Sequence, residues 1–138
     1  MEKFMKRVTG IGGVFFQAKD AAALQAWYKR HLGIDVQEWG GTAFRWVDSE
    51  GQPTGGSTIW SVSSVDSEMF APGNATFMIN YRVDNLDELL TQLRDGGVEI
   101  VSGPESHENG KFAWILDLDG NKVELWEPKI WDEKNKEG

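Results

Sequence analysis

A weak internal repeat constrains the fold of this chain more than any other feature of its sequence. Residues 44–51 read FRWVDSEG, and residues 113–120 read AWILDLDG. Residues 14–33, VFFQAKDAAALQAWYKRHLG, match residues 79–98, INYRVDNLDELLTQLRDGGV, in the order of their apolar and polar positions. The chain is therefore expected to contain two copies of one structural module.

Each copy has the pattern of one helix among four strands. In the first copy a β-rich segment ends at Asp20, a suitable N-cap, and the apolar residues that follow have helical spacing up to Gly33. The remaining strands of the first copy are expected at residues 35–39, 42–48 and 57–63. The second copy is expected to have strands at residues 76–83, 99–101, 111–116 and 122–127, with a helix at 86–95.

Length and composition indicate one soluble domain of 138 residues, with modules at residues 8–64 and 74–128. Neither module alone is long enough to bury much core. The net charge of −8 argues against a nucleic-acid partner, because such proteins usually carry a basic surface. No apolar run is long enough to span a membrane. The first residues, MEKFMKRVTG, lack the apolar stretch of a secretory signal, so we expect a cytoplasmic location.

Alternation along the strands predicts a curved sheet with one mixed polar and aromatic face. Gln17, Asn80 and Arg82 share a face with one another, and Glu124 and Trp126 share a face of the last strand. Such a concave surface is suited to a small-molecule ligand. The alternative is that these side chains face solvent on a half-exposed antiparallel sheet.

The closing hairpin, residues 117–126, reads D-x-D-G-N-x-x-E-L-W and resembles that of the vicinal oxygen chelate (VOC) superfamily. This superfamily includes glyoxalase I, extradiol dioxygenases and bleomycin-resistance proteins. The chain departs from the common pattern at Leu118, where such proteins usually have proline. The resemblance implies an α+β fold in which two tandem βαβββ modules form an incomplete eight-stranded barrel. It also implies a cavity on the concave side and a homodimer.

Metal-dependent members of this superfamily place one ligand in each of four strands. By the resemblance and the repeat, these positions fall on Gly13, Thr58, Met78 and Glu124. Of these, Glu124 is the single residue suited to a divalent ion, since three or four His or carboxylate ligands are normally required. The sequence therefore predicts that the usual metal cofactor is absent. A divalent metal held by atypical ligands, such as His107 or residues of a second chain, stays open as an alternative.

Glu124 and His107 are the candidate catalytic residues. Enclosed beside Trp126, Glu124 would have a raised pKa and could act as a general base. Alternatively, Glu124 forms an ion pair with Arg82 or Arg45. His107 lies in the segment SGPESHENG, which is expected to be irregular, and is either a structural residue or part of a loop that folds over the cavity.

Aromatic and polar strand residues are the candidate ligand contacts. The tryptophans of the strands either line the cavity and stack on a planar ligand or pack in the core. The candidate ligand-binding residues are Gln17, Trp46, Trp60, Asn80, Arg82, Trp114 and Trp126.

Three functions remain open from the sequence. The first is metal-independent binding of a small aromatic or cationic molecule, as the resemblance to bleomycin-resistance proteins implies. The second is a lyase, isomerase or dioxygenase of the glyoxalase type with an atypical metal site. The third is a metal-free enzyme in which Glu124 or His107 transfers protons while Arg82 or Asn80 stabilises an oxyanion.

Overall fold

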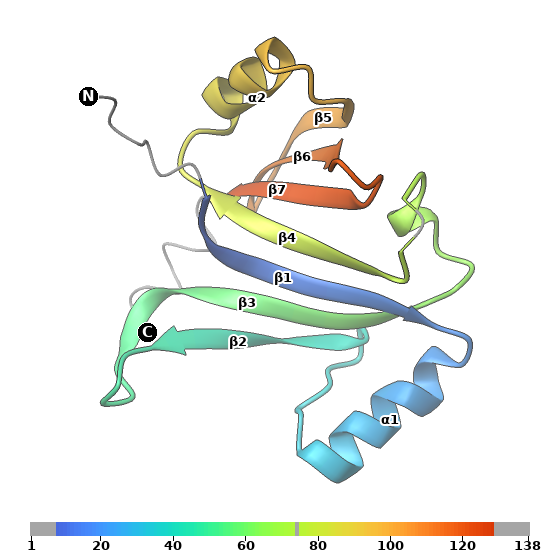
Figure 1. Cartoon of the computed structure of the whole chain (residues 1–138). Helices are drawn as coiled ribbons and strands as arrows, with labels where there is room; N and C mark the ends of the chain where they lie inside the picture. Colours follow the sequence, from blue (N-terminus) through green and yellow to red (C-terminus); the bar gives the residue numbers. More distant parts are fainter. Residues whose placement is uncertain (1–7, 74, 129–138) are drawn as a thin grey trace.

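The computed structural model describes residues 8–73 and 75–128, which form one mixed sheet and two helices (Figure 1). The helices are α1 (Ala21–Leu32) and α2 (Leu86–Asp95). A short 3-10 helix, η1, spans Glu68–Phe70. The strands are β1 (Val8–Ala18), β2 (Gly41–Val47), β3 (Pro53–Ser64), β4 (Phe77–Val83), β5 (Ile100–His107), β6 (Gly110–Leu116) and β7 (Lys122–Pro128).

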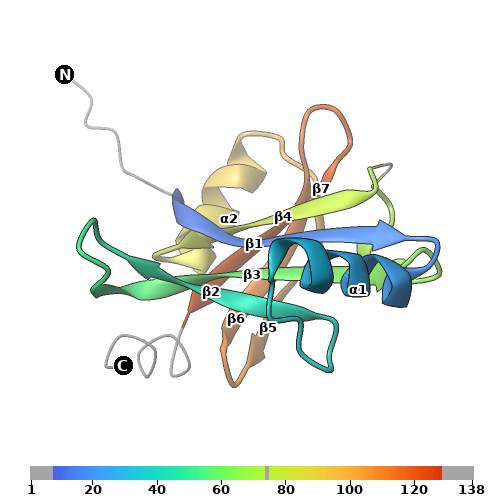
Figure 2. The same cartoon turned by 90° about the horizontal axis from the view of Figure 1, so that it is seen from below.

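The two modules join side by side at the centre of the sheet. The strand order is β2-β3-β1-β4-β7-β6-β5, so β1 pairs with both β3 and β4. Within each module the first and last strands pair in parallel, β1 with β3 and β4 with β7, whereas β1 and β4 are antiparallel. Figure 2 shows β6 and β7 running steeply across the direction of β1 and β3, as expected for a strongly twisted sheet. The sheet is open, with β2 and β5 as its edges.

The strand predicted at residues 35–39 is not formed, so the described part of the chain has seven strands where eight were expected. The backbone of this segment bonds locally instead. The Val36 N–H donates to the Ile34 carbonyl at 2.8 Å, and the Gly40 N–H donates to the Gln37 carbonyl at 2.9 Å. These bonds close a turn directly before β2, which leaves no extended run to pair with that strand.

The segment that contains His107 is more regular than the sequence suggested. Residues 100–107 form β5, and His107 pairs with Gly110 across the β5–β6 hairpin. The prediction of an irregular loop there was therefore wrong. The extended form is set by pairing with β6, a long-range contact that local sequence patterns do not report.

The predicted ends of the helices are confirmed. The Asp20 carboxylate accepts a hydrogen bond from the Ala23 N–H at 3.0 Å, and Gly33 has a left-handed conformation, with φ of 69°. Asn85 caps α2 in the same way, since its side chain accepts from the Glu88 N–H at 3.1 Å. None of the helices in the described ranges is long and apolar enough to cross a membrane.

The sheet separates two groups of buried side chains. On one face, Val83 and Leu125 pack with Leu86, Leu89 and Leu90 of α2. The other face has a second cluster, formed by the side chains of Phe15, Phe70 and Met78. This second cluster joins the two modules and the segment between them.

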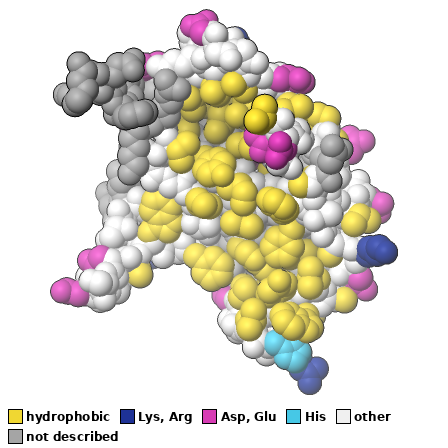
Figure 3. Space-filling model, in the orientation of Figure 1, with side chains coloured by type: hydrophobic (Ala, Val, Ile, Leu, Met, Phe, Trp, Pro, Cys, Tyr) yellow, Lys and Arg dark blue, Asp and Glu magenta, His cyan; other side chains and the backbone are white. Residues whose placement is uncertain are grey.

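The first helix covers the sheet less completely than the second. Tyr28 of α1 meets Trp60 of β3 edge to face, with ring centroids 5.1 Å apart, and Trp60 meets Phe16 in the same way at 5.5 Å. No residue of α1 is fully buried. Figure 3 shows hydrophobic side chains gathered over the face of the molecule seen in Figure 1, with acidic side chains around its margin.

Candidate functional site

One row of residues crosses the middle of the sheet and carries the polar part of the candidate site. Strand pairing places Ile59 of β3 beside Gly13 of β1, Gly13 beside Asn80 of β4, and Asn80 beside Glu124 of β7. Trp114 of β6 completes the row next to Glu124. The pairing register therefore brings an amide, a carboxylate and an indole from three strands together.

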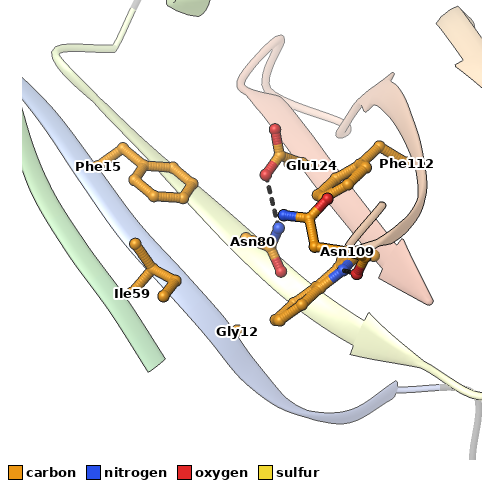
Figure 4. A pocket seen from close by; sticks show the side chains of 8 residues that line it. Gly12, Phe15, Ile59, Asn80, Asn109, Phe112 and Glu124 are labelled. Carbon is orange, nitrogen blue, oxygen red and sulfur yellow. Dashed lines mark hydrogen bonds between the residues drawn. The ribbon is translucent and has the colours of Figure 1, made fainter. Parts of the chain in front are cut away.

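A cavity of about 220 Å³ opens next to this row. Figure 4 shows Phe15 and Ile59 on one side of it, and Phe112, Asn109 and Glu124 on the other. Apolar side chains make up most of the wall, which is typical of sites for small organic molecules. The lining residues are Gly12, Phe15, Ile59, Asn80, Asn109, Phe112, Glu124 and Trp126.

Glu124 is held in place by two N–H donors. Its Oε1 accepts a hydrogen bond from Asn80 Nδ2 at 2.6 Å, and its Oε2 accepts one from Trp114 Nε1 at 2.8 Å. Burial raises the pKa of the Glu124 carboxyl above its ordinary value, although the two hydrogen bonds and the charge of Lys122 act in the opposite direction. Within the described residues, the groups that act on the Glu124 carboxyl are Asn80, Trp114 and Lys122, and neither Arg82 nor Arg45, the partners considered from the sequence, is among them.

Asn80 keeps a second polar atom buried at the edge of the cavity, beside Gly12. Asn80 is 2% exposed, and its Oδ1 has no hydrogen-bond partner within the described residues. Gly12 provides the space for this oxygen, since a Cβ at Gly12 would collide with Asn80 Oδ1 and lie 2.8 Å from the Trp126 ring. A buried acceptor without a donor is costly, and such groups often mark sites where a ligand supplies the missing donor.

Stacked aromatic rings form the wall opposite Phe15. The Phe112 ring lies nearly parallel to the rings of Trp126 and Trp114, with centroids 6.0 Å and 6.4 Å away. The Trp126 Nε1 donates to the backbone carbonyl of Asn109 at 2.8 Å, which ties the tip of the β5–β6 hairpin to β7. This wall is therefore fixed by ring packing and by one hydrogen bond.

Two of the four positions assigned as metal ligands from the repeat lie outside the row that contains Glu124. The strands pair so that Asn80 and Ile59 stand in this row, and Met78 and Thr58 do not. The low identity between the modules does not fix their alignment to single residues, and β1 has register shifts against β4. The ligand positions taken from the repeat are therefore corrected by the observed register.

Neither Met78 nor Thr58 offers a free ligand atom to the cavity. Met78 is 1% exposed and packs with Phe15 and Phe70. Thr58 uses its hydroxyl twice, accepting from Trp46 Nε1 at 2.7 Å and donating to a backbone carbonyl of β1, also at 2.7 Å. Both side chains serve packing or hydrogen bonding within the fold.

The residues of the row do not fit a divalent metal. Gly13 has no side chain, and a Cβ there would press against the Phe15 ring and lie 3.2 Å from the Ile59 carbonyl. Glu124 is the one carboxylate of the row, and both of its oxygens already accept hydrogen bonds. Across residues 8–73 and 75–128, no three His, Asp or Glu side chains gather closely enough to hold a metal ion.

The other predicted ligand contacts are divided between the two faces. Arg82 is 8% exposed, and its guanidinium lies 4.6 Å from the Trp46 ring and 5.8 Å from the Trp126 ring, close to the cavity. Trp60 packs beneath α1, as described above. Gln17 lies further along β1, beside Ser63, and does not line the cavity.

His107 lies apart from Glu124 on the outer part of the β5–β6 hairpin. Its side chain is 54% exposed, and its Nε2 is 3.1 Å from Glu105 Oε1. Its ring lies 5.7 Å from that of Phe112, which does line the cavity. The structure therefore brings Glu124, Asn80, Trp114 and Trp126 together and leaves His107 at the periphery.

Several lining residues were missed by sequence reasoning. Phe15 could have been found, since strand alternation already placed it on the face of Gln17. Asn109 and Phe112 had no such signal, because they reach the cavity through the hairpin fold and its bond to Trp126. Gly12 was missed because the register shift in β1 interrupts simple alternation.

The fold defines a class of α+β proteins in which two tandem modules, each with a helix after its first strand, share one mixed sheet. A family model described as the Glyoxalase/Bleomycin resistance protein/Dioxygenase superfamily matches residues 10–125. The chain therefore belongs to this superfamily, also called the vicinal oxygen chelate superfamily, as the closing hairpin predicted. No curated protein is significantly similar to the chain in sequence.

Solved structures of similar fold include enzymes of different chemistry. The methylmalonyl-CoA epimerase from Mycobacterium tuberculosis is 20% identical, with a TM-score of 0.60 over 94% of this chain and 95% of that one. A Streptomyces coelicolor methylmalonyl-CoA epimerase variant in complex with 2-nitronate-propionyl-CoA is 17% identical, with a TM-score of 0.63 over 89% and 99%. The NAD-dependent benzaldehyde dehydrogenase from Legionella pneumophila is 18% identical, with a TM-score of 0.55 over 85% and 98%. At such identities these similarities establish the fold alone.

Proposed function

We propose that this protein binds a small molecule with a single flat apolar ring in the cavity beside Glu124, without a divalent metal. The observation that carries the proposal is a cavity whose aromatic walls end in two buried polar groups, Asn80 and Glu124. Its volume of about 220 Å³ exceeds that of an engineered apolar cavity of about 150 Å³ that binds benzene. The space is therefore suited to one ring with a short substituent.

The side chains of the row support a function that does not need a metal. The carboxylate of Glu124 is oriented by protein N–H groups, which is how a carboxylate is prepared to meet a ligand. The positions that would complete a metal site hold a glycine, an amide and an aliphatic side chain: Gly13, Asn80 and Ile59. This set favours recognition of an organic molecule by packing and hydrogen bonds.

The proposal is tested by titrating the 15N-labelled protein with toluene while following the indole N–H signals. We expect the signals of Trp126 and Trp114 to shift, because these rings lie at the cavity, and the signal of Trp39, exposed in the turn before β2, to stay unchanged. Gly12→Ala should weaken binding at least tenfold, since its methyl group would enter the space of Asn80 Oδ1. Gly96→Ala is the matched control, because the nearest atom to its Cβ is 3.4 Å away.

Two results would overturn the proposal. One is the absence of any shift at Trp126 and Trp114 up to the solubility limit of toluene. The other is near-stoichiometric metal in protein purified without chelator, lost in Glu124→Ala, as measured by plasma mass spectrometry. If Gly12→Ala fails to fold, Ile59→Phe fills the cavity from another wall and replaces it.

A second function, supported by the raised pKa of Glu124, is metal-free acid–base catalysis. A carboxyl whose pKa is raised by burial can exchange protons closer to neutral pH than an exposed one. Turnover of a bound ligand that requires no metal and is lost in Glu124→Gln would favour this function over binding alone. The exposed position of His107 makes it a weaker candidate for the same role.

A further inference from the structure

The polar end of the cavity presents buried hydrogen-bond acceptors. Asn80 Oδ1 is buried and has no partner in the described part of the chain. Each carboxylate oxygen of Glu124 accepts one hydrogen bond and can accept another. A ligand that reaches this end therefore meets oxygen atoms that require donors.

The amide and indole N–H groups of Asn80, Trp114 and Trp126 at this end are already engaged. Trp114 Nε1 and Asn80 Nδ2 both donate to Glu124, at 2.8 Å and 2.6 Å. Trp126 Nε1 donates to the Asn109 carbonyl at 2.8 Å. An acceptor on the ligand would have to compete with these bonds, except at the exposed amide of Asn109.

Charge favours the same choice of ligand. Glu124 is the one ionisable residue that lines the cavity, and the nearby guanidinium of Arg82 lies against the Trp46 and Trp126 rings, 4.6 Å and 5.8 Å from their centres. Lys122, the cationic residue whose charge acts on Glu124, donates its Nζ to the Met69 carbonyl at 2.8 Å. An anionic ligand would bring a like charge to Glu124, whereas a cation would supply the counter-charge that a buried carboxylate needs.

We propose that the ligand is a primary arylmethyl amine, whose ammonium group donates to Asn80 Oδ1 and Glu124 while its ring lies between Phe15 and the Phe112–Trp126 wall. This inference rests on the proposed function, since it specifies the ligand class of the same cavity. A protonated amine has three N–H donors and no acceptor, which matches the free acceptors. Aromatic rings beside the ammonium group would add cation–π attraction.

Four ligands of one shape class test the inference in the complete protein: benzylamine, benzyl alcohol, toluene and benzoate. We expect benzylamine to bind about tenfold to a hundredfold more tightly than toluene, because hydrogen bonds to charged groups contribute more than neutral ones. Benzyl alcohol should fall between them, and benzoate should bind more weakly than toluene. Affinities would be measured by calorimetry and by the Trp126 and Trp114 indole signals.

Glu124→Gln and Glu50→Gln form a matched pair of variants with the same loss of charge. Glu50 lies exposed in the turn between β2 and β3, away from the cavity. We expect Glu124→Gln to weaken benzylamine binding at least tenfold while toluene binding changes less than twofold, and Glu50→Gln to change neither. If Glu124→Gln does not fold, the order of the four ligands on the wild-type protein still decides the question.

The outcomes separate this inference from the proposed function. The ligand class is wrong, and the binding cavity stands, if toluene binds and benzylamine binds no more tightly than toluene. The same conclusion holds if benzoate binds as tightly as benzylamine. If neither toluene nor benzylamine binds, both proposals fail. If benzyl alcohol matches benzylamine and Glu124→Gln leaves both unaffected, the donor is a neutral hydroxyl and the cationic ligand is overturned.

Discussion

The surroundings of Glu124 act on its pKa in opposite directions. Burial raises this pKa, whereas the hydrogen bonds from Asn80 and Trp114 and the charge of Lys122 lower it. Because the folded protein binds the Glu124 proton more tightly than the unfolded chain does, this residue favours folding most at low pH. That contribution is lost as pH rises from the ordinary carboxyl pKa through the raised one.

We therefore predict that the difference in unfolding free energy between the wild type and Glu124→Gln changes with pH. The wild type should be most favoured, relative to the variant, at or below the ordinary pKa of a glutamate. It should lose this advantage as pH increases, by about 1.4 kcal/mol for each tenfold difference in proton affinity between the folded and unfolded states. Urea unfolding at a series of pH values measures the difference.

The control for this experiment is Glu50→Gln, which removes a charge from an exposed turn. Its difference from the wild type should vary less with pH than that of Glu124→Gln. A Glu124→Gln difference that stayed constant or grew in favour of the wild type with rising pH would contradict the assignment. Direct NMR titration of the Glu124 carboxyl carbon would then show the direction of the shift.

Single residues of the site were predictable from sequence where strand alternation or the closing motif fixed them. Glu124 is part of the D-x-D-G-N-x-x-E-L-W motif, and Asn80 lies on the expected polar face. The neighbour relation between them was not predictable, since it depends on the parallel register of β4 and β7. A shift of one residue would turn every side chain to the other face.

At the scale of elements, local signals identified the helices well and the edge strands poorly. Asp20 acts as the predicted cap because a cap needs only residues a few positions away, and Asn85 caps α2 in the same way. The predicted strand at residues 35–39 failed because edge strands depend on a neighbour, and here the segment forms a turn before β2. β5 is longer than predicted because β6 supplies a neighbouring strand with which it pairs.

A strand also stabilises the start of α2, a contact that the sequence did not reveal. The Glu127 Oε1 of β7 accepts a hydrogen bond from the Leu86 N–H at 2.8 Å, in addition to the Asn85 cap. We predict that Glu127→Ala lowers the unfolding free energy by about 1 kcal/mol, as typical loss of a helix cap does. Glu127→Gln, which keeps an acceptor oxygen, should retain most of that energy.

Urea unfolding of the two Glu127 variants measures this contribution, and amide exchange at Leu86 locates it. Faster exchange at Leu86 in Glu127→Ala than in Glu127→Gln is the expected signature. Equal stability of the alanine variant and the wild type would mean that Asn85 alone is sufficient to cap α2. A large loss in both variants would instead indicate that the charge of Glu127, rather than its hydrogen bond, stabilises the helix.

On the scale of the whole molecule, the repeat predicted the architecture because duplicated modules must bury their faces against each other. β1 and β4 of the two modules pair at the centre of the sheet, and the α+β fold of the superfamily is confirmed. The segment between modules is more than a connection, since Phe70 of η1 is 2% exposed and packs with Met78. The homodimer implied by the resemblance stays a prediction.

This shared core leads to a prediction for the isolated first module, residues 1–73. Without the second module, β1 would lose its pairing with β4 and become an exposed sheet edge. Phe15 and Phe70 would lose their contact with Met78. We therefore expect this fragment to show no cooperative thermal unfolding as a monomer, measured by circular dichroism with the mass checked by sedimentation. An equimolar mixture with residues 74–138 should recover cooperative unfolding, whereas a cooperative transition of the monomeric fragment alone would contradict the shared core.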